Sequence, residues 1–223
     1  MTARWRVCQH HAMPRPLPPE LVAPDHTALV VVECQNSVLG PGSTIPALAE
    51  EAHDIAIPNI ARLLDAARAA DVPVIHCTVR FRADGLGASR NAPLLRRAGP
   101  MGASRSTVPG IDAAAPIDEL QPAESDIVLE RIRGIGPMSG TDLDGVLRNL
   151  RVTTVVATGV SVNVAVTNCV MDSVNLGYDV VLPKDAVAGI PREYADAVIK
   201  NVHSFLTTLT MTDDLIAVWS AAG

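Results

Sequence analysis

Short Val-rich runs alternate with helical segments along most of the chain, and this alternation limits the folds that the sequence can adopt. Each run is almost continuously apolar and ends in polar residues, which is typical of a strand buried on both faces of a parallel sheet. Strands that alternate with helices are joined by right-handed crossovers, so we expect helices on both faces of the sheet. The sequence therefore predicts an α/β fold, a three-layer sandwich around a six-stranded, mostly parallel sheet, with strands at residues 26–35, 73–80, 125–131, 152–160, 178–189 and 207–211.

The domain organisation follows from the length of the chain and from where periodic patterning begins. A chain of 223 residues fits one domain of ordinary size with a sizeable core. Residues 1–24 are rich in proline and carry little periodicity, so we expect an N-terminal arm that packs on the surface or on another subunit. Residues 25–223 then form a single α/β domain, in which the long, Gly- and Pro-rich segment 81–116 is expected to act as a lid or an interface arm.

Charge and hydropathy exclude several classes of partner. The net charge is −6 and no basic run occurs, whereas a nucleic-acid-binding surface needs clustered basic residues. No apolar run reaches the ~18 residues of a membrane span, and the N-terminus lacks the apolar region of a signal peptide. We therefore expect an acidic globular protein that handles a small molecule and binds neither nucleic acid nor a membrane.

The spacing of cysteine and histidine residues gives no indication of a metal site or a cofactor. Cys8, His10 and His11 lie close together, but structural zinc usually needs four well-spaced ligands. The remaining cysteines also lack the short pairings of zinc sites and disulfide frameworks; they are Cys34, Cys77 and Cys169. We predict no metal, no cofactor and a reduced, cytoplasmic location.

One carboxylate stands out at the carboxyl ends of the predicted strands, where open α/β sheets bind their ligands. Glu33 ends the first strand, in a position where the carboxyl group would be desolvated. Desolvation is expected to raise its pKa unless a cation lies close. A carboxyl group with a raised pKa can act as a general acid near neutral pH. The alternative is a structural ion pair or a helix-cap acceptor.

Cations and a helix N-terminus lie at the other strand ends. Arg80 follows the second strand, and Arg131 and Arg133 follow the third. An arginine can hold a substrate carboxylate in bidentate fashion, although at least one of Arg131 and Arg133 is expected to be a solvated loop cation. The turn after the fourth strand leads into a helix, whose free N–H groups and dipole suit an anion or oxyanion, unless it is only a tight connection.

The sulfur nearest to that turn belongs to Cys169, which lies well inside the following helix. Apolar residues surround the helix on nearly all sides, so we expect it to be buried. Burial raises the pKa of a thiol and lowers its reactivity. A packing role is therefore favoured over a catalytic one for Cys169.

Two segments resemble the isochorismatase-like, or cysteine hydrolase, superfamily over about residues 27–219. "ALVVVECQN" is similar to the family's first strand, an apolar run that usually ends in Asp-x-Gln-Asn. Residues 129–189 are similar to the second half, with a Gly-Thr-x-Leu helix start, a Thr-Gly-Val turn and a Gly-Tyr strand that leads to Asp-Ala. The resemblance implies a six-stranded parallel sheet, assembly into homodimers or homotetramers, and a non-proline cis peptide at Val160–Ser161.

The resemblance also implies an Asp, Lys and Cys triad in the amidase branch, and this chain departs from it at all three places. Glu33 stands at the Asp position and Ala165 at the Cys position. The Lys position falls on or next to Arg131. An amidase of this type needs a thiolate where Ala165 stands, and the metal ligands of the nicotinamidases are not recognisable after Thr78.

A branch without the cysteine offers a different interpretation. True isochorismatases carry a small residue at that place and hydrolyse an enol ether with a carboxylic acid as the proton donor. By this resemblance Glu33 would be the acid in a hydrolase of a small carboxylated molecule. The residues expected to bind the substrate or line its pocket are Gln35, Arg80, Arg131, Arg133, Val160, Ser161 and Asn163.

Three functions stay open from the sequence alone. The first is the cysteine-free hydrolase, the second is a catalytically silent relative that binds a ligand or a partner, and the third is an amidase that uses Cys169. The feature that separates the first two is geometric, namely whether Glu33 and an arginine face one cavity next to Ala165.

Overall fold

A computed structural model describes residues 17–96 and 108–222 as one α/β domain built on a parallel sheet. The predicted fold class is confirmed. The sheet has seven strands rather than six, with six in the order β3-β2-β1-β4-β5-β7 and with β6 paired to β4. The strands are β1 Thr27–Val32, β2 Val74–Val79, β3 Ile127–Arg131, β4 Thr154–Val160, β5 Asp179–Pro183, β6 Val187–Ala188 and β7 Thr208–Thr210.

The seventh strand arises because the segment predicted as one strand at residues 178–189 is divided. β5 ends at Pro183, and the N–H of Ala186 donates to the Pro183 carbonyl at 3.0 Å in a tight turn. The chain then continues as β6, which pairs with the end of β4 through Gly159 and Val160. β6 therefore lies beside the turn from β4 into the helix that follows it, at the carboxyl ends of the strands, where ligands are expected to bind.

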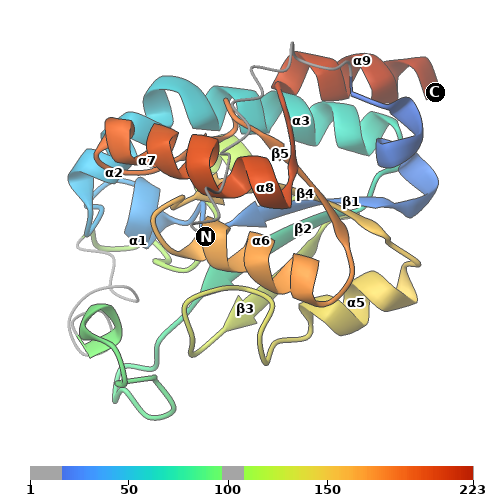
Figure 1. Cartoon of the computed structure of the whole chain (residues 1–223). Helices are drawn as coiled ribbons and strands as arrows, with labels where there is room; N and C mark the ends of the chain where they lie inside the picture. Colours follow the sequence, from blue (N-terminus) through green and yellow to red (C-terminus); the bar gives the residue numbers. More distant parts are fainter. Residues whose placement is uncertain (1–16, 97–107, 223) are drawn as a thin grey trace, which may run out of the picture.

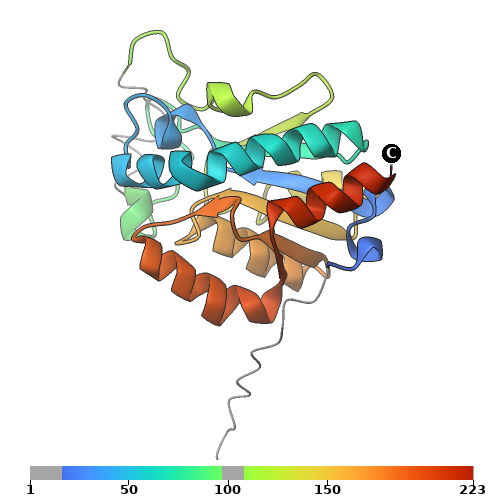
Figure 2. The ribbon, with the colours of Figure 1, turned by 90° about the horizontal axis from the view of Figure 1, so that it is seen from above.

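Helices cover both faces of the sheet, as Figures 1 and 2 show, and each face has its own apolar core. One layer holds α2 Pro46–Glu51, the π-helical turn η3 Ala52–Ala56, α3 Ile57–Ala69 and α9 Thr212–Ala222. The other holds α5 Leu143–Asn149, α6 Ala165–Asn175, α7 Arg192–Val198, the π-helical turn η5 Ile199–His203 and α8 Ser204–Leu206. Further short elements are η1 Pro19–Val22, η2 Pro24–His26, α1 Asn36–Leu39 and η4 Asp118–Leu120.

The central strands of the sheet are buried on both faces, and this burial stabilises the sheet. Every residue of β1, β2 and β4 is buried, so both faces of these strands are removed from water. Each fully buried Val, Leu or Ile side chain contributes about 1.5–3 kcal/mol of transfer free energy. Because the strands lie side by side and parallel, their carboxyl ends reach the same edge of the sheet.

α6 is the helix that matters most for the site, and its burial follows from its sequence. Its buried residues recur at helical spacing and face the sheet; they are Ala165, Val166, Cys169, Val170 and Ser173. The helix ends as predicted, because Gly177 follows it with φ of 86°, a conformation that favours glycine.

The end of the predicted N-terminal arm packs on its own domain. Val22 is fully buried, and its carbonyl accepts a hydrogen bond of 2.9 Å from Nε1 of Trp219 in α9. Cys8, His10 and His11, considered above as metal ligands, lie outside the described residues.

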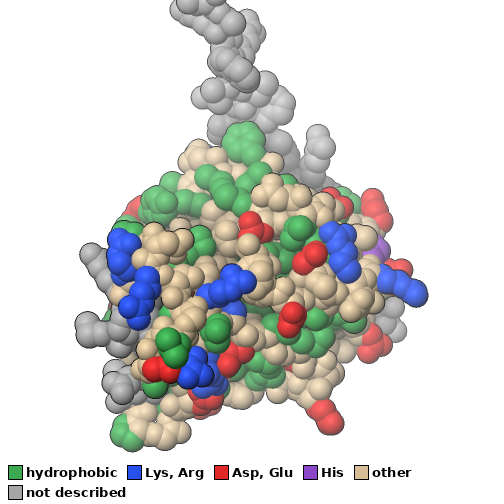
Figure 3. All heavy atoms as spheres, turned by 90° about the horizontal axis from the view of Figure 1, so that it is seen from below, with side chains coloured by type: hydrophobic (Ala, Val, Ile, Leu, Met, Phe, Trp, Pro, Cys, Tyr) green, Lys and Arg blue, Asp and Glu red, His purple; other side chains and the backbone are tan. Residues whose placement is uncertain are grey.

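Two properties of the structure bear on the expectation that the protein binds neither nucleic acid nor a membrane. No helix within residues 17–96 and 108–222 combines the length and apolar character that crossing a membrane requires. On the face shown in Figure 3, Lys and Arg side chains are interspersed with Asp and Glu, so this face carries no continuous basic surface.

Candidate active site

The register of the sheet brings three strand ends together. Val32, the last residue of β1, lies opposite Gly159 of β4 and Cys77 of β2. Arg131, the last residue of β3, lies opposite Val79 of β2. Glu33 follows β1 directly, so it emerges between the end of β2 and the turn from β4 into α6.

Glu33 has an unusual backbone conformation. Its φ of 52° places it in the left-handed region, which side chains with a Cβ rarely adopt. Its N–H still donates to the Cys77 carbonyl at 2.8 Å, while its carbonyl already accepts from the N–H of Gln35 at 2.8 Å. The chain therefore leaves the sheet abruptly at Glu33, and such strained positions are found most often at functional sites.

Arg131 reaches Glu33 across β2. Leu129, two residues earlier on the same face of β3, packs against the core cluster that contains Cys77, so Arg131 points toward the α6 side of the sheet. Its Nη2 donates to Oε1 of Glu33. The side chains of Arg131 and Glu33 are only 6% and 18% exposed, so the ion pair is largely withdrawn from water.

The ion pair leaves part of the guanidinium unused. In the described part of the chain, Nε and Nη1 of Arg131 are buried and have no hydrogen-bond acceptor. A buried N–H donor without a partner is costly, so such atoms indicate a polar ligand or water in the working protein. Arg131 therefore has donors to offer a substrate while it still contacts Glu33.

The N-terminus of α6 forms the third side of the site. The peptide bond between Val160 and Ser161 is cis, as the family resemblance implies. No side chain caps the helix at Val164, but the N–H groups of Val164 and Val166 already donate to the Ser161 carbonyl at 3.1 and 3.0 Å. The helix end therefore favours an anion chiefly through its dipole. Ala165 is the first helical residue and is 3% exposed. Its methyl group offers no nucleophile.

One cavity of about 580 Å³ joins these three groups. Glu33, Arg131 and Ala165 all line it, together with Ser161 and Asn163 from the β4–α6 turn. The arrangement that the sequence left open is therefore present, with a carboxylate and an arginine facing one cavity beside Ala165. Chemically it can hold an anion and transfer a proton, but none of the thiols in the described part of the chain lines it.

The described cysteines are all buried. Cys169 is fully buried one turn inside α6, and burial raises the pKa of its thiol to about 12. Burial, with a smaller effect of the Glu33 charge, raises the pKa of Cys34 to about 12 as well. Burial also raises the pKa of Cys77. At neutral pH all three are thiols rather than thiolates, and a thiol is a poor nucleophile.

Gln35 and Arg80, which were expected to bind substrate, lie outside the lining of this cavity. The Gln35 amide is fully buried and holds the end of β2, because its Oε1 accepts from the Val79 N–H at 2.7 Å and its Nε2 donates to the Val79 carbonyl at 2.8 Å. Arg80 forms two hydrogen bonds with Asp112, at 2.8 and 2.9 Å, and one with Glu130 at 2.7 Å. Both side chains are committed to the loops around the site.

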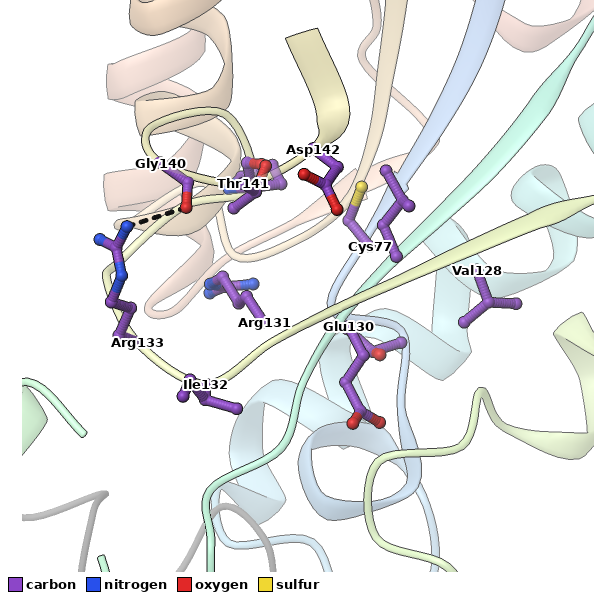
Figure 4. A pocket seen from close by; sticks show the side chains of 12 residues that line it. Cys77, Val128, Glu130, Arg131, Ile132, Arg133, Gly140, Thr141 and Asp142 are labelled. Atoms are coloured by element: carbon purple, nitrogen blue, oxygen red, sulfur yellow. Dashed lines mark hydrogen bonds between the residues drawn. The ribbon is translucent and has the colours of Figure 1, made fainter. Parts of the chain in front are cut away.

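Arg133 and Val160 also lie outside the cavity lining. Figure 4 shows Arg133 in a second cavity, of about 400 Å³, where it donates to the Gly140 carbonyl at 2.9 Å. Arg131 lines both cavities and lies between them. Val160 is fully buried in β4. Of the three candidate arginines, Arg131 is therefore the one that lines the cavity with Glu33.

Most of the cavity wall comes from residues that sequence patterning does not single out. They are aliphatic or aromatic residues from segments that are far apart in the chain: Val38, Ile45, Leu48, Val79, Phe81, Leu94, Leu95, Ile135, Val164 and Ile190. The only signal for them was the long segment after β2, which contributes Phe81, Leu94 and Leu95.

Comparison with known proteins identifies the family. The model of the isochorismatase domain matches residues 27–214. The chain belongs to the isochorismatase family. The resemblance inferred from the sequence is thereby confirmed, and the chain is a hydrolase of this family.

Individual relatives agree with this assignment. The chain is 30% identical over 225 residues to the ureidoacrylate amidohydrolase RutB of Pseudomonas savastanoi pv. phaseolicola, covering 96% of this chain and 90% of the relative. An isochorismatase family protein from Desulfovibrio vulgaris is 29% identical with a TM-score of 0.72, over 87% of this chain and 98% of that one. A cysteine hydrolase from Pseudomonas syringae pv. phaseolicola, 24% identical, shares the fold with a TM-score of 0.76 over 94% and 97% of the two chains.

Proposed function

We propose that this isochorismatase-family hydrolase cleaves a small carboxylated molecule by general acid catalysis from Glu33, without a cysteine nucleophile. The observation that carries the proposal is the shared cavity, in which Glu33 and Arg131 lie beside Ala165 at the α6 N-terminus. The buried state of Cys169 supports it further, because that thiol neither lines the cavity nor ionises near neutral pH.

In this proposal Arg131 binds the substrate carboxylate. Its Nε and Nη1 donors have no acceptor within the described residues. They lie on different edges of the guanidinium, so the substrate carboxylate would accept from one of them together with the second N–H of Nη2, whose other N–H contacts Glu33. The uncapped N-terminus of α6 adds a favourable field for the same negative charge. Binding therefore satisfies groups that the protein leaves unpaired.

Glu33 is the proton donor in this proposal. Its carboxyl group and the substrate carboxylate would share the Arg131 guanidinium, which places the donor next to the bound substrate. Glu33 then donates its proton to the substrate, at carbon in the case of an enol ether. Water adds to the resulting cation, the hemiketal collapses to a carbonyl compound and an alcohol, and Glu33 recovers a proton from the water.

A catalytically silent binding protein is the second candidate, and one observation favours it. Glu33 is already paired with Arg131, which is also how a purely structural carboxylate would be held. The two candidates share the ligand site and differ only in turnover.

We further infer a reducing, cytoplasmic setting and assembly into a homodimer or homotetramer. The unpaired state of Cys34, Cys77 and Cys169 supports the first inference. The resemblance to a family of oligomers supports the second.

The test is a turnover assay of the wild-type protein on a panel of carboxylated enol ethers, including isochorismate, and of small amides, including ureidoacrylate. We expect hydrolysis of at least one carboxylated enol ether, with a rate that is unaffected by prior treatment of the native protein with iodoacetamide. Binding without turnover across the whole panel would favour the silent relative, and loss of activity in step with alkylation would contradict the cysteine-free mechanism.

A further inference from the structure

The polar groups of the active-site cavity are confined to one end. Of the polar side chains in its lining, Thr44 donates to the Ser37 carbonyl at 3.0 Å. The Asn163 amide is paired at both ends with the backbone of Ile190, at 2.5 and 2.9 Å. The groups left for a ligand belong to Glu33, Arg131 and the turn at Ser161, which lie together at the strand ends.

The remaining wall is apolar. Among the described residues, ten aliphatic or aromatic residues besides Ala165 line the cavity, and none of them offers a side-chain hydrogen bond to a ligand. Five of them are buried even though they face an open space; they are Val38, Leu48, Val79, Phe81 and Leu95. A polar ligand group placed against this wall would lose its hydrogen bonds to water without replacement.

Three large aliphatic side chains of the same wall are exposed. Ile45 is 37%, Leu94 48% and Ile135 40% exposed, and they come from three separate segments of the chain. Exposed apolar groups that converge at one cavity are typical of a ligand site rather than of ordinary surface. They extend the apolar wall from the interior of the cavity to its mouth.

We propose that the substrate is a monocarboxylate with a hydrocarbon body, in which the carboxylate lies against Arg131 and the body fills the apolar wall. This inference rests on the proposed function for the position of the carboxylate. It adds the prediction that a second polar or charged group at the far end of the substrate is rejected. Ile45, Leu94 and Ile135 then determine specificity, because they contact the part of the body farthest from Arg131.

The test measures dissociation constants for a series of straight-chain carboxylates by calorimetry. Acetate, butyrate and hexanoate lengthen the body two methylenes at a time, and each buried methylene strengthens binding by at most about fourfold. We expect hexanoate to bind at least about tenfold more tightly than acetate. Adipate has the same length as hexanoate but ends in a second carboxylate, so it should lose that gain.

Variants at the mouth of the cavity test the residues themselves. Ile45→Ser and Ile135→Ser should each weaken hexanoate binding about threefold or more while leaving acetate unchanged. Phe205→Ser is the matched control, because Phe205 is 82% exposed on α8 and does not line the cavity. Equal affinities for acetate, hexanoate and adipate, or equal effects of all three substitutions, would overturn the inference.

Hexanamide separates this inference from the proposed carboxylate site. If hexanamide binds as tightly as hexanoate and affinity still rises with chain length in amides, the apolar wall binds the hydrocarbon body as proposed. The proposed binding of a carboxylate by Arg131 is then wrong. If carboxylates bind more tightly than amides but chain length has no effect, the proposed binding of a carboxylate by Arg131 is supported. The proposal of a hydrocarbon body in the substrate is then wrong.

Discussion

Glu33→Gln is expected to lower kcat/KM for hydrolysis by at least about 100-fold, the usual contribution of a general acid. Glutamine has nearly the same shape as glutamate and keeps an oxygen for the Arg131 N–H, but it has no proton to give as an acid. The substrate carboxylate should still bind, because the donors of Arg131 remain. Initial rates and ligand titrations on the same preparation separate these two effects.

The fold should survive this substitution, although with reduced stability. The hydrogen bond from Arg131 loses the charge of its acceptor, which costs about 1–2 kcal/mol of unfolding free energy. Urea unfolding of the variant measures this cost directly and shows whether lost activity reflects lost structure.

Glu130→Gln is the matched control for Glu33→Gln. Glu130 is the neighbour of Arg131 on β3, pairs with Arg80 at 2.7 Å and does not line the Glu33 cavity. The same chemical change there should leave the rate within about twofold, since surface ion pairs contribute little. If Glu33→Gln retains the full rate, Glu33 is not the proton donor and the proposed mechanism is wrong.

Gly159→Ala is expected to cost about 4 kcal/mol of unfolding free energy, from backbone strain and overpacking together. Gly159 has φ of 101°, and a Cβ there would lie 2.2 Å from the carbonyl oxygen of Val32 and 2.7 Å from its nitrogen. Both atoms belong to the backbone of β1, so they cannot rotate away as a side chain would. β1 and β4 would have to separate at the point where they position Glu33 and the turn into α6.

Gly145→Ala provides the control for Gly159→Ala. Gly145 lies within α5, and a Cβ there would meet nothing within 4 Å. Alanine in a helix interior is more stable than glycine by roughly 0.5–1 kcal/mol, so this variant should be slightly stabilised. Urea midpoints for the two variants should therefore move in opposite directions. Wild-type stability in Gly159→Ala would contradict the close approach of β1 and β4.

The sequence predicts the fold well because burial and period are local properties of each segment. The continuous apolar runs of β1, β2 and β4 identify central parallel strands, and Gly177 marks the end of α6. The division of residues 178–189 into β5 and β6 could not be predicted from the sequence, because it depends on which strand the residues after Pro183 pair with.

The candidate site is predictable only in part. Glu33, Arg131 and Ala165 follow from strand ends and from the family resemblance, and the structure brings them to one cavity. Gln35 and Arg80 occupy equally suggestive positions, but Val79, Asp112 and Glu130, which hold them, lie 32 to 50 residues away in the chain. Such long-range pairs decide whether a polar side chain faces a ligand or holds a loop, and no local pattern reports them.

The most direct test of the central claim is a comparison of wild-type protein and Cys169→Ala on enol ethers that carry one carboxylate and on small amides, with initial rates measured side by side. Cys169 is the cysteine nearest in sequence to the position where the family carries its nucleophile. We expect hydrolysis of an enol ether at the same rate, within about twofold, in both proteins, because Glu33 and not a thiol carries the chemistry. Hydrolysis of an amide by the wild type that disappears in Cys169→Ala would contradict the claim and would place the nucleophile one turn further along α6.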